Sequence, residues 1–178
     1  MNSQISYKEE LLKANNNLSE DSKYIYIGYG LQKGRALGTL KDISSKQIIE
    51  MPVAENLMVG FAVGLSLKGY KPVVFIERMD FLMNSLDAIV NHLDKIQKKS
   101  LYEFNPAIII RCIVGNINKP LYTGVTHTQD HSEALRLMIS FPVIQIKNAS
   151  DVELAYNEAK MNMSNGVSTV LVEYKDLI

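Results

Sequence analysis

Apolar and polar residues recur along the chain with two different periods. Apolar residues at steps of three and four predict helices, which we place at Ser6 to Leu18, Glu55 to Leu67, Asp80 to Lys98, Ala134 to Ser140 and Ser150 to Met161. Short runs rich in β-branched and aromatic residues predict strands, at Tyr24 to Ile27, Gln47 to Glu50, Val73 to Glu77, Ala107 to Val114, Val143 to Lys147 and Val167 to Tyr174. Because helices and strands alternate, we expect an α/β fold: a three-layer sandwich whose mainly parallel sheet is covered by helices on both faces.

The ends of these elements carry turn and capping residues. Gly28 and Gly30 stop the first strand, and Gly69 ends the apolar helix. The segment Asp130 to Glu133 fits a capping box at the start of the helix Ala134 to Ser140. Ligands of parallel α/β folds bind at the carboxyl ends of the strands, so residues that follow strands are the first functional candidates.

Composition and charge narrow the classes of function. The chain has 178 residues, 47% of them hydrophobic, and no repeat or linker divides it, so we expect one domain over residues 1–178. Lys plus Arg and Asp plus Glu both number 19, which gives no single-sign field for nucleic acid or a membrane surface. The single cysteine, Cys112, excludes an internal disulfide, and Met1 to Gln4 begin no signal peptide. We expect a cytoplasmic protein.

The loop Gly28 to Gly34 directly follows a predicted strand. Glu50 ends the next strand, 20 residues past Gly30, as in a dinucleotide-binding fingerprint. The glycine spacing is loose, and plain turn chemistry is the commoner reason for such a pair. A dinucleotide-binding module that uses this loop is therefore an alternative function.

Glu55 stands in the first turn of an otherwise apolar helix. A carboxylate there complements the helix dipole, which is the simplest explanation of its presence. The same helix contains Gly60 and Gly64, each of which costs ~1 kcal/mol relative to alanine. This cost indicates a close backbone approach, for example to a partner subunit.

The three histidines differ in chemical promise. His92 falls on the polar side of its helix, where we expect it to be solvated. His127 and His131 are four residues apart, but no third ligand is near in sequence and His131 lies at a helix start, so we assign no metal site. His127 lies in a loop between a buried strand and a helix and is the better candidate for proton transfer, the alternative being a histidine that bonds only to backbone.

Five motifs, taken in order, resemble the pyrimidine-binding domain of thiamine diphosphate-dependent enzymes. The likeness is closest to the beta subunits of 2-oxo acid dehydrogenases, and extends to transketolases and deoxyxylulose phosphate synthases. It runs from about Tyr24 to the end of the chain. The motifs are Met51-Pro-Val-Ala-Glu55, Gly60 to Gly64, Gly69-Tyr-Lys-Pro-Val73, Met79-Asp-Phe81 with Asp87 to Asn91, and Thr126-His-Thr-Gln129.

The resemblance implies a role for three residues. Glu55 matches the catalytic glutamate that hydrogen-bonds the aminopyrimidine ring nitrogen of the cofactor, and Phe81 matches the aromatic residue that stacks on that ring. His127 matches a catalytic histidine near the reacting carbons. The implied cofactor is thiamine diphosphate, and the implied reaction cleaves or forms a carbon–carbon bond next to a carbonyl.

The chain also departs from the family pattern. Gly28-Tyr29-Gly30 stands where acidic residues are common, and Cys112 to Asn116 replaces a glycine-rich turn. No Gly-Asp-Gly followed by an asparagine pair occurs, so we expect the diphosphate and its magnesium to be held by a partner subunit, in a homodimer or heterotetramer. We also expect no counterpart of the family's carboxy-terminal domain within residues 1–178, so that the chain is either one subunit of a split enzyme or a piece cut from a longer protein. We expect the chain to be inactive without its partner; a non-catalytic assembly relative is the remaining alternative.

Overall fold

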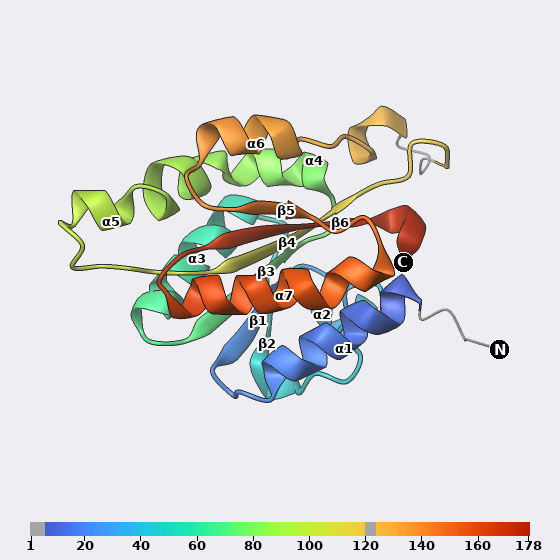
Figure 1. Cartoon of the computed structure of the whole chain (residues 1–178), viewed down its shortest axis with the longest axis horizontal. Helices are drawn as coiled ribbons and strands as arrows, with labels where there is room; N and C mark the ends of the chain where they lie inside the picture. The colour runs from blue at the N-terminus through green and yellow to red at the C-terminus, as the bar shows by residue number, and fades with distance from the viewer. Residues whose placement is uncertain (1–5, 120–123) are drawn as a thin grey trace.

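A six-stranded parallel sheet forms the centre of the computed structural model, which describes residues 6–119 and 124–178 (Figure 1). The strand order is β2-β1-β3-β4-β6-β5, and all neighbouring strands run parallel. The predicted α/β fold is confirmed. Met1 to Gln4 lie outside the described residues. The strands are β1 (Tyr24–Gly28), β2 (Ile48–Glu50), β3 (Lys71–Ile76), β4 (Ile109–Val114), β5 (Val143–Gln145) and β6 (Thr169–Tyr174).

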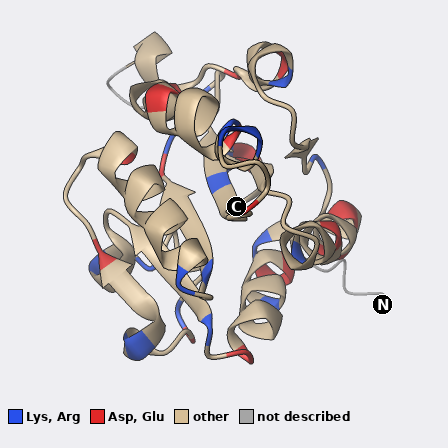
Figure 2. Cartoon of the chain, turned by 90° about the vertical axis from the view of Figure 1, so that its left-hand side faces the viewer, with Lys and Arg blue, Asp and Glu red and all other residues tan. Residues whose placement is uncertain are grey.

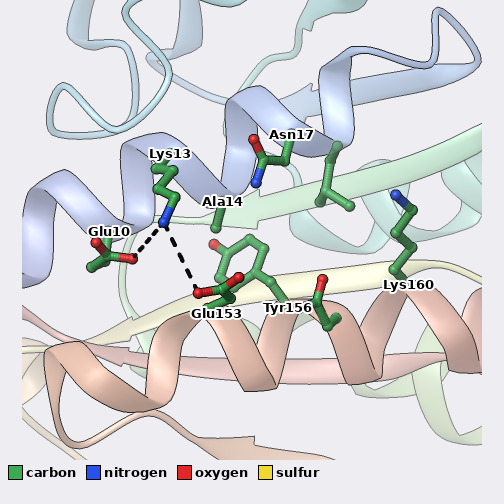
Figure 3. A pocket seen from close by; sticks show the side chains of 9 residues that line it. Glu10, Lys13, Ala14, Asn17, Glu153, Tyr156 and Lys160 are labelled. Atoms are coloured by element: carbon green, nitrogen blue, oxygen red, sulfur yellow. Dashed lines mark ion pairs between the residues drawn. The ribbon is translucent and has the colours of Figure 1, made fainter.

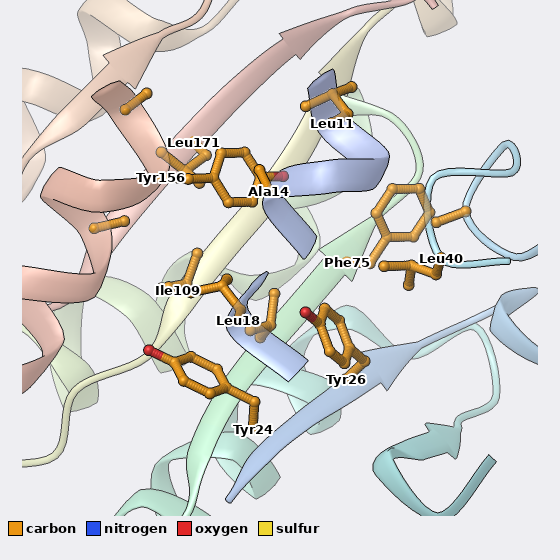
Figure 4. Packing of buried hydrophobic residues seen from close by; sticks show 14 of the residues in the cluster. Leu11, Ala14, Leu18, Tyr24, Tyr26, Leu40, Phe75, Ile109, Tyr156 and Leu171 are labelled. Atoms are coloured by element: carbon orange, nitrogen blue, oxygen red, sulfur yellow. The ribbon is translucent and has the colours of Figure 1, made fainter. Parts of the chain in front are cut away.

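Helices cover both faces of this sheet. On one face lie α1 (Tyr7–Ser19) and α7 (Ala149–Ser164), and on the other lie α3 (Glu55–Leu67), α4 (Met79–Leu82) and α6 (Ser132–Met138). Successive strand residues point to opposite faces, so Tyr24 and Tyr26 pack beneath α1 and α7 while Ile25 and Ile27 pack against α3 (Figure 4). Shorter elements are α2 (Leu31–Gly34), α5 (Ile96–Lys99), and the 3₁₀ turns η1 (Ser45–Gln47), η2 (Met83–Ser85), η4 (Gly124–His127) and η5 (Lys175–Leu177).

A buried ion pair lies in the layer beneath α1 and α7. Arg111 of β4 donates to Glu173 of β6 through Nε at 2.8 Å and Nη2 at 2.9 Å, and both side chains are fully buried. Tyr156, Asn15 and Thr39 satisfy further atoms of the pair. Burial opposes the charge on Arg111, but the adjacent Glu173 carboxylate outweighs it and holds the arginine pKa above its usual value. Removing one partner alone would leave an uncompensated buried charge.

The helix predicted over Asp80 to Lys98 is wrong as a continuous element. The segment passes from α4 through η2 into a π-helix, η3 (Asp87–Leu93), and ends in α5. At the point of change the backbone N–H of Ala88 donates to the side-chain Oδ1 of Asn56 at 3.1 Å. A residue of another helix thus binds the amide at this transition, a contact that a periodic pattern along one segment does not reveal.

The capping box predicted at Asp130 to Glu133 is also wrong. Helix α6 begins at Ser132, and Asp130 accepts hydrogen bonds from the backbone N–H of Ser132 at 2.9 Å and from its hydroxyl at 2.5 Å. Glu133 pairs with Arg136 one turn later instead of reaching back to the cap. Asp130 therefore binds the first residue of the helix without the reciprocal bond that a capping box requires of Glu133.

Among the described residues, no helix is both long and apolar enough to cross a membrane. Acidic and basic residues are interspersed along the ribbon in Figure 2, in keeping with their equal numbers in the sequence.

Candidate functional site at the carboxyl edge of the sheet

Glu55 lies near the carboxyl edge of the sheet, where β2 ends and α3 begins. It is the first residue of α3, and the first helical bond there runs from Met58 N–H to Ala54 O at 3.0 Å. Only 6% of Glu55 is exposed, although α3 has no side-chain cap. The helix dipole favours a negative charge at this position, which offsets part of the cost of burying the carboxylate.

One side chain donates a hydrogen bond to this carboxylate. The amide Nδ2 of Asn84, in η2, lies 3.3 Å from Glu55 Oε2. Sequence reasoning missed Asn84. The available signal was its spacing, because Asn84 lies three residues after Phe81, about one helical turn, and so faces the same side.

Phe81 and His127 are in direct contact. Their ring centroids are 5.0 Å apart and the planes are inclined at 87°, an edge-to-face arrangement. Both side chains are partly buried, and His127 Nδ1 lies 3.0 Å from the hydroxyl of Thr126. The segment Met79–Ser85 thus links the three predicted site residues: it touches Glu55 through Asn84 and His127 through Phe81.

The neighbouring histidine has a different environment. The backbone N–H of His131 lies 3.3 Å from Met79 Sδ, and His131 is the N-cap residue of α6 without a side-chain capping bond. Asp130, one residue earlier, also accepts from Gln145 at 3.0 Å and from the Tyr174 hydroxyl at 2.9 Å. Burial raises the pKa of Asp130, but the hydrogen bonds from Ser132, Tyr174 and Gln145 together outweigh it, and the pKa falls below its usual value. Asp130 thereby ties the loop that carries both histidines to β5 and β6.

The glycine loop after β1 has its amides occupied by the protein itself. Glu50 accepts from the backbone N–H of Gly30 at 2.5 Å and of Gln32 at 2.7 Å. In a dinucleotide site this carboxylate would face a ribose and the amides would face a pyrophosphate. Here the Glu50 carboxylate itself binds the amides of Gly30 and Gln32, and this contact does not favour the dinucleotide-binding alternative.

Two other residues singled out in the sequence have ordinary roles. Cys112 is fully buried in β4, and burial raises its pKa well above the usual value, so the thiol is a poor nucleophile. The side chain of His92 is 63% exposed and lies 3.4 Å from Asp87. Within residues 6–119 and 124–178, no group of three or more His, Cys, Asp or Glu side chains is arranged to hold a metal ion.

A shallow groove lies elsewhere, between α1 and α7 (Figure 3). Lys13 crosses it, with Nζ 3.8 Å from Glu10 Oε2 and 4.0 Å from Glu153 Oε2. These helices cover the face of the sheet opposite to α3. The groove is therefore separate from Glu55, Phe81 and His127.

Comparison with known proteins decides the family. The family model described as the transketolase pyrimidine-binding domain matches residues 14–175. The chain belongs to this family. As a pyrimidine-binding domain it has a structural neighbour titled "Split gene transketolase, inactive beta4 tetramer", with a TM-score of 0.74 and 17% identity over 96% of this chain and 52% of that one.

The related sequences are beta subunits of 2-oxo acid dehydrogenases. The pyruvate dehydrogenase E1 beta subunit of Cyanidium caldarium is 30% identical over 146 residues, 79% of this chain and 42% of that protein. The corresponding subunit of Acholeplasma laidlawii is 26% identical over 114 residues, 64% of this chain and 33% of that protein. The matched part of this pyrimidine-binding domain thus spans less than half the length of these relatives.

Proposed function

We propose that this chain supplies the pyrimidine-binding half of a thiamine diphosphate site in an enzyme that cleaves or forms a carbon–carbon bond next to a carbonyl. The observation that carries the proposal is the buried carboxylate of Glu55 near the carboxyl edge of the sheet, in a chain of this family. The reaction resembles those of 2-oxo acid dehydrogenases and transketolases. These two classes of enzyme differ in the molecule that accepts the carbon fragment, and the proposal includes both classes.

The residues present fit the cofactor's pyrimidine ring. Within the described residues, the only hydrogen bond to the Glu55 side chain comes from Asn84 to Oε2. Oε1 is thus open to a ring nitrogen, and a carboxylate is the group that exchanges a proton with a weakly basic nitrogen. Phe81 supplies a partly buried aromatic ring on the adjacent segment. When bound, thiamine diphosphate supplies the carbanion chemistry at its thiazolium carbon.

Each of the three residues has a distinct task in this proposal. Glu55 holds and exchanges the proton at the pyrimidine nitrogen, and Phe81 orients the ring by stacking. His127 serves the substrate: an imidazole at this place can give a proton to a developing alkoxide or carboxylate. The edge contact between Phe81 and His127 would then place substrate chemistry directly beside the cofactor ring.

A partner subunit completes the site in this proposal. It would carry the diphosphate-binding half and the magnesium ion, as the similarity of this chain to beta subunits suggests. The outer face of α3 suits a subunit contact, because Leu57 and Phe61 are 53% and 40% exposed and the exposed Gly60 and Gly64 lie on the same side of the helix. The beta-subunit relatives and the tetrameric title of the structural neighbour support an oligomer.

Titration calorimetry tests the split site directly. We expect the purified chain to show no tight binding of thiamine diphosphate with magnesium, and to gain both binding and turnover when the partner subunit is added. The partner is obtained by co-purification from the native source. Micromolar affinity of the chain alone would contradict the division of the site, and a complex without cofactor binding would contradict the function.

A further inference from the structure

Two asparagine side chains fasten the first turn of α3 to the segment beneath it. Asn84 Nδ2 donates to Glu55 Oε2 at 3.3 Å, and Asn56 Oδ1 accepts from the backbone N–H of Ala88 at 3.1 Å. Residues 55 and 56 are consecutive, and their partners lie four residues apart. In both contacts the donor lies in the lower segment and the acceptor lies in the first turn of α3.

The backbone of the lower segment is irregular at this point. A 3₁₀ turn ends at Ser85, and a π-helix begins at Asp87 and continues to Leu93, with Asp94 N–H bonded to Ile89 O at 2.9 Å. Runs of π-helix are rare in proteins and are frequent at functional sites. Ala88, whose N–H is bound by Asn56, lies at this transition, so the contact helps to set where the helix changes its winding.

We propose that Asn84 and Asn56 are positioning residues for Glu55, a role that rests on the proposed function of that carboxylate. Asn84 fixes the carboxylate rotamer by occupying Oε2 and leaves Oε1 to face the cofactor ring. Asn56 fixes the distance of Glu55 from the lower segment, because it holds the first turn of α3 against Ala88. Because a displacement of about 1 Å of a reacting group costs roughly 10²-fold in rate, both contacts act on the proton exchange at the ring nitrogen.

The contact itself is testable in the full chain without cofactor or partner. We expect the side-chain amide resonances of Asn84 in ¹⁵N spectra to shift with pH as Glu55 ionises. In Glu55→Gln this dependence should vanish, while the amide resonances of Asn91, which donates to Asp87 at 2.9 Å, keep theirs. An Asn84 amide whose pH dependence is the same in both proteins would overturn the proposal.

The catalytic consequence is measured in the complex with the partner subunit. We expect Asn84→Ala and Asn56→Ala to lower kcat by about 10- to 100-fold with the KM of the substrate within about two-fold. Hydrogen–deuterium exchange at the thiazolium carbon should slow by the same factor per bound cofactor, whereas Asn91→Ala, an exposed asparagine of the same segment, should leave both rates within about two-fold.

The outcomes separate the positioning role from the proposed function. If Asn84 responds to Glu55 but Glu55→Gln retains full activity, the proposed function fails and the contact remains structural. If Glu55→Gln is inactive while both asparagine variants exchange at the normal rate per folded molecule, the positioning role is wrong. A loss that only follows the folded fraction, measured by thermal unfolding, also contradicts it.

Discussion

The backbone carbonyl oxygen of His127 lies 1.8 Å from the position that a β-carbon on Gly115 would occupy. Gly115 directly follows β4, so the loop that carries His127 is packed against the end of this strand. The atom in the way belongs to the backbone, which cannot turn aside as a flexible side chain does. The place of His127 near Phe81 therefore depends on the absence of a side chain at Gly115, 12 residues earlier in the sequence.

We expect Gly115→Ala to displace the loop that carries His127. Forcing an extra methyl group into a packed region costs typically ~1–3 kcal/mol, so the melting temperature should fall and the rate of the reconstituted complex should fall with it. Gly34→Ala is the matched control, because a β-carbon at Gly34 has no heavy atom within 4 Å. Unchanged melting temperature and rate in Gly115→Ala would contradict this prediction, because the loop would then accommodate the methyl group without strain.

Glu55→Gln removes the proton-exchanging group and keeps its size. We expect the rate of the complex to fall by ~10²–10⁴, the usual range for a lost acid–base step, with the melting temperature nearly unchanged. Glu133→Gln changes an exposed carboxylate of α6 and should alter neither quantity. A fully active Glu55→Gln would return Glu55 to the simpler role of an acid at a helix start.

Phe81→Ala tests the stacking role. Stacking is worth ~1 kcal/mol beyond burial, so we expect cofactor affinity to weaken by about five-fold or more while the chemical step changes less. Phe141 is buried against the same side of the sheet, and Phe141→Ala should instead cost ~3–5 kcal/mol of stability. Early unfolding of Phe81→Ala, with normal cofactor binding once folded, would assign Phe81 to the core.

His127 and His131 are expected to separate in function although they are four residues apart. His127→Ala should depress the rate with substrate and leave cofactor affinity within a few-fold, because its ring faces the site beside Phe81. His131→Ala should leave the rate and the cofactor affinity unchanged, because the His131 side chain makes no capping bond to α6 and its contact with Met79 is made by the backbone N–H, which alanine keeps. Calorimetry and steady-state kinetics on the complex measure both. Loss of cofactor binding in His127→Ala, or a normal substrate rate, contradicts the assignment.

Leu101 occupies a position where the chain elsewhere uses glycine. Helices α3, α5 and α7 end in the same pair of backbone bonds, and the left-handed residue is Gly69, Leu101 and Gly166 respectively, with φ of 83°, 52° and 73°. The leucine is 85% exposed and gains little from packing. Left-handed geometry costs ~1–2 kcal/mol for such a residue, so Leu101→Gly should raise the free energy of unfolding by about 0.5–1 kcal/mol in urea denaturation.

The matched control reverses this change at the end of α3. Gly69→Ala meets no steric obstacle within 4 Å, so its only expected cost is the left-handed backbone. It should lower the free energy of unfolding by about 1 kcal/mol. A Leu101→Gly protein that unfolds at lower urea than the parent would mean that the exposed leucine has a stabilising contact.

The sequence alone determined those helices and strands that arise from interactions between residues close together in the chain. Alternating periods predict the parallel sheet and its covering helices, and the apolar run that begins at Glu55 predicts α3 with the bounds that the structure has. Helix and strand periods arise between residues a few positions apart, so they can be read along one segment. The roles of Glu55, Phe81 and His127 come from motifs in order, and they stay predictions.

The tertiary structure decided what depends on residues far apart in the chain. Asn56 binds the amide of Ala88 at the point where the winding changes, in a segment whose apolar spacing predicts one continuous helix. Glu50 binds the amides of the loop that it would have left open in a dinucleotide site. Such contacts form only when the sheet brings separate segments together, and their hydrogen bonds outweigh the weak local preferences.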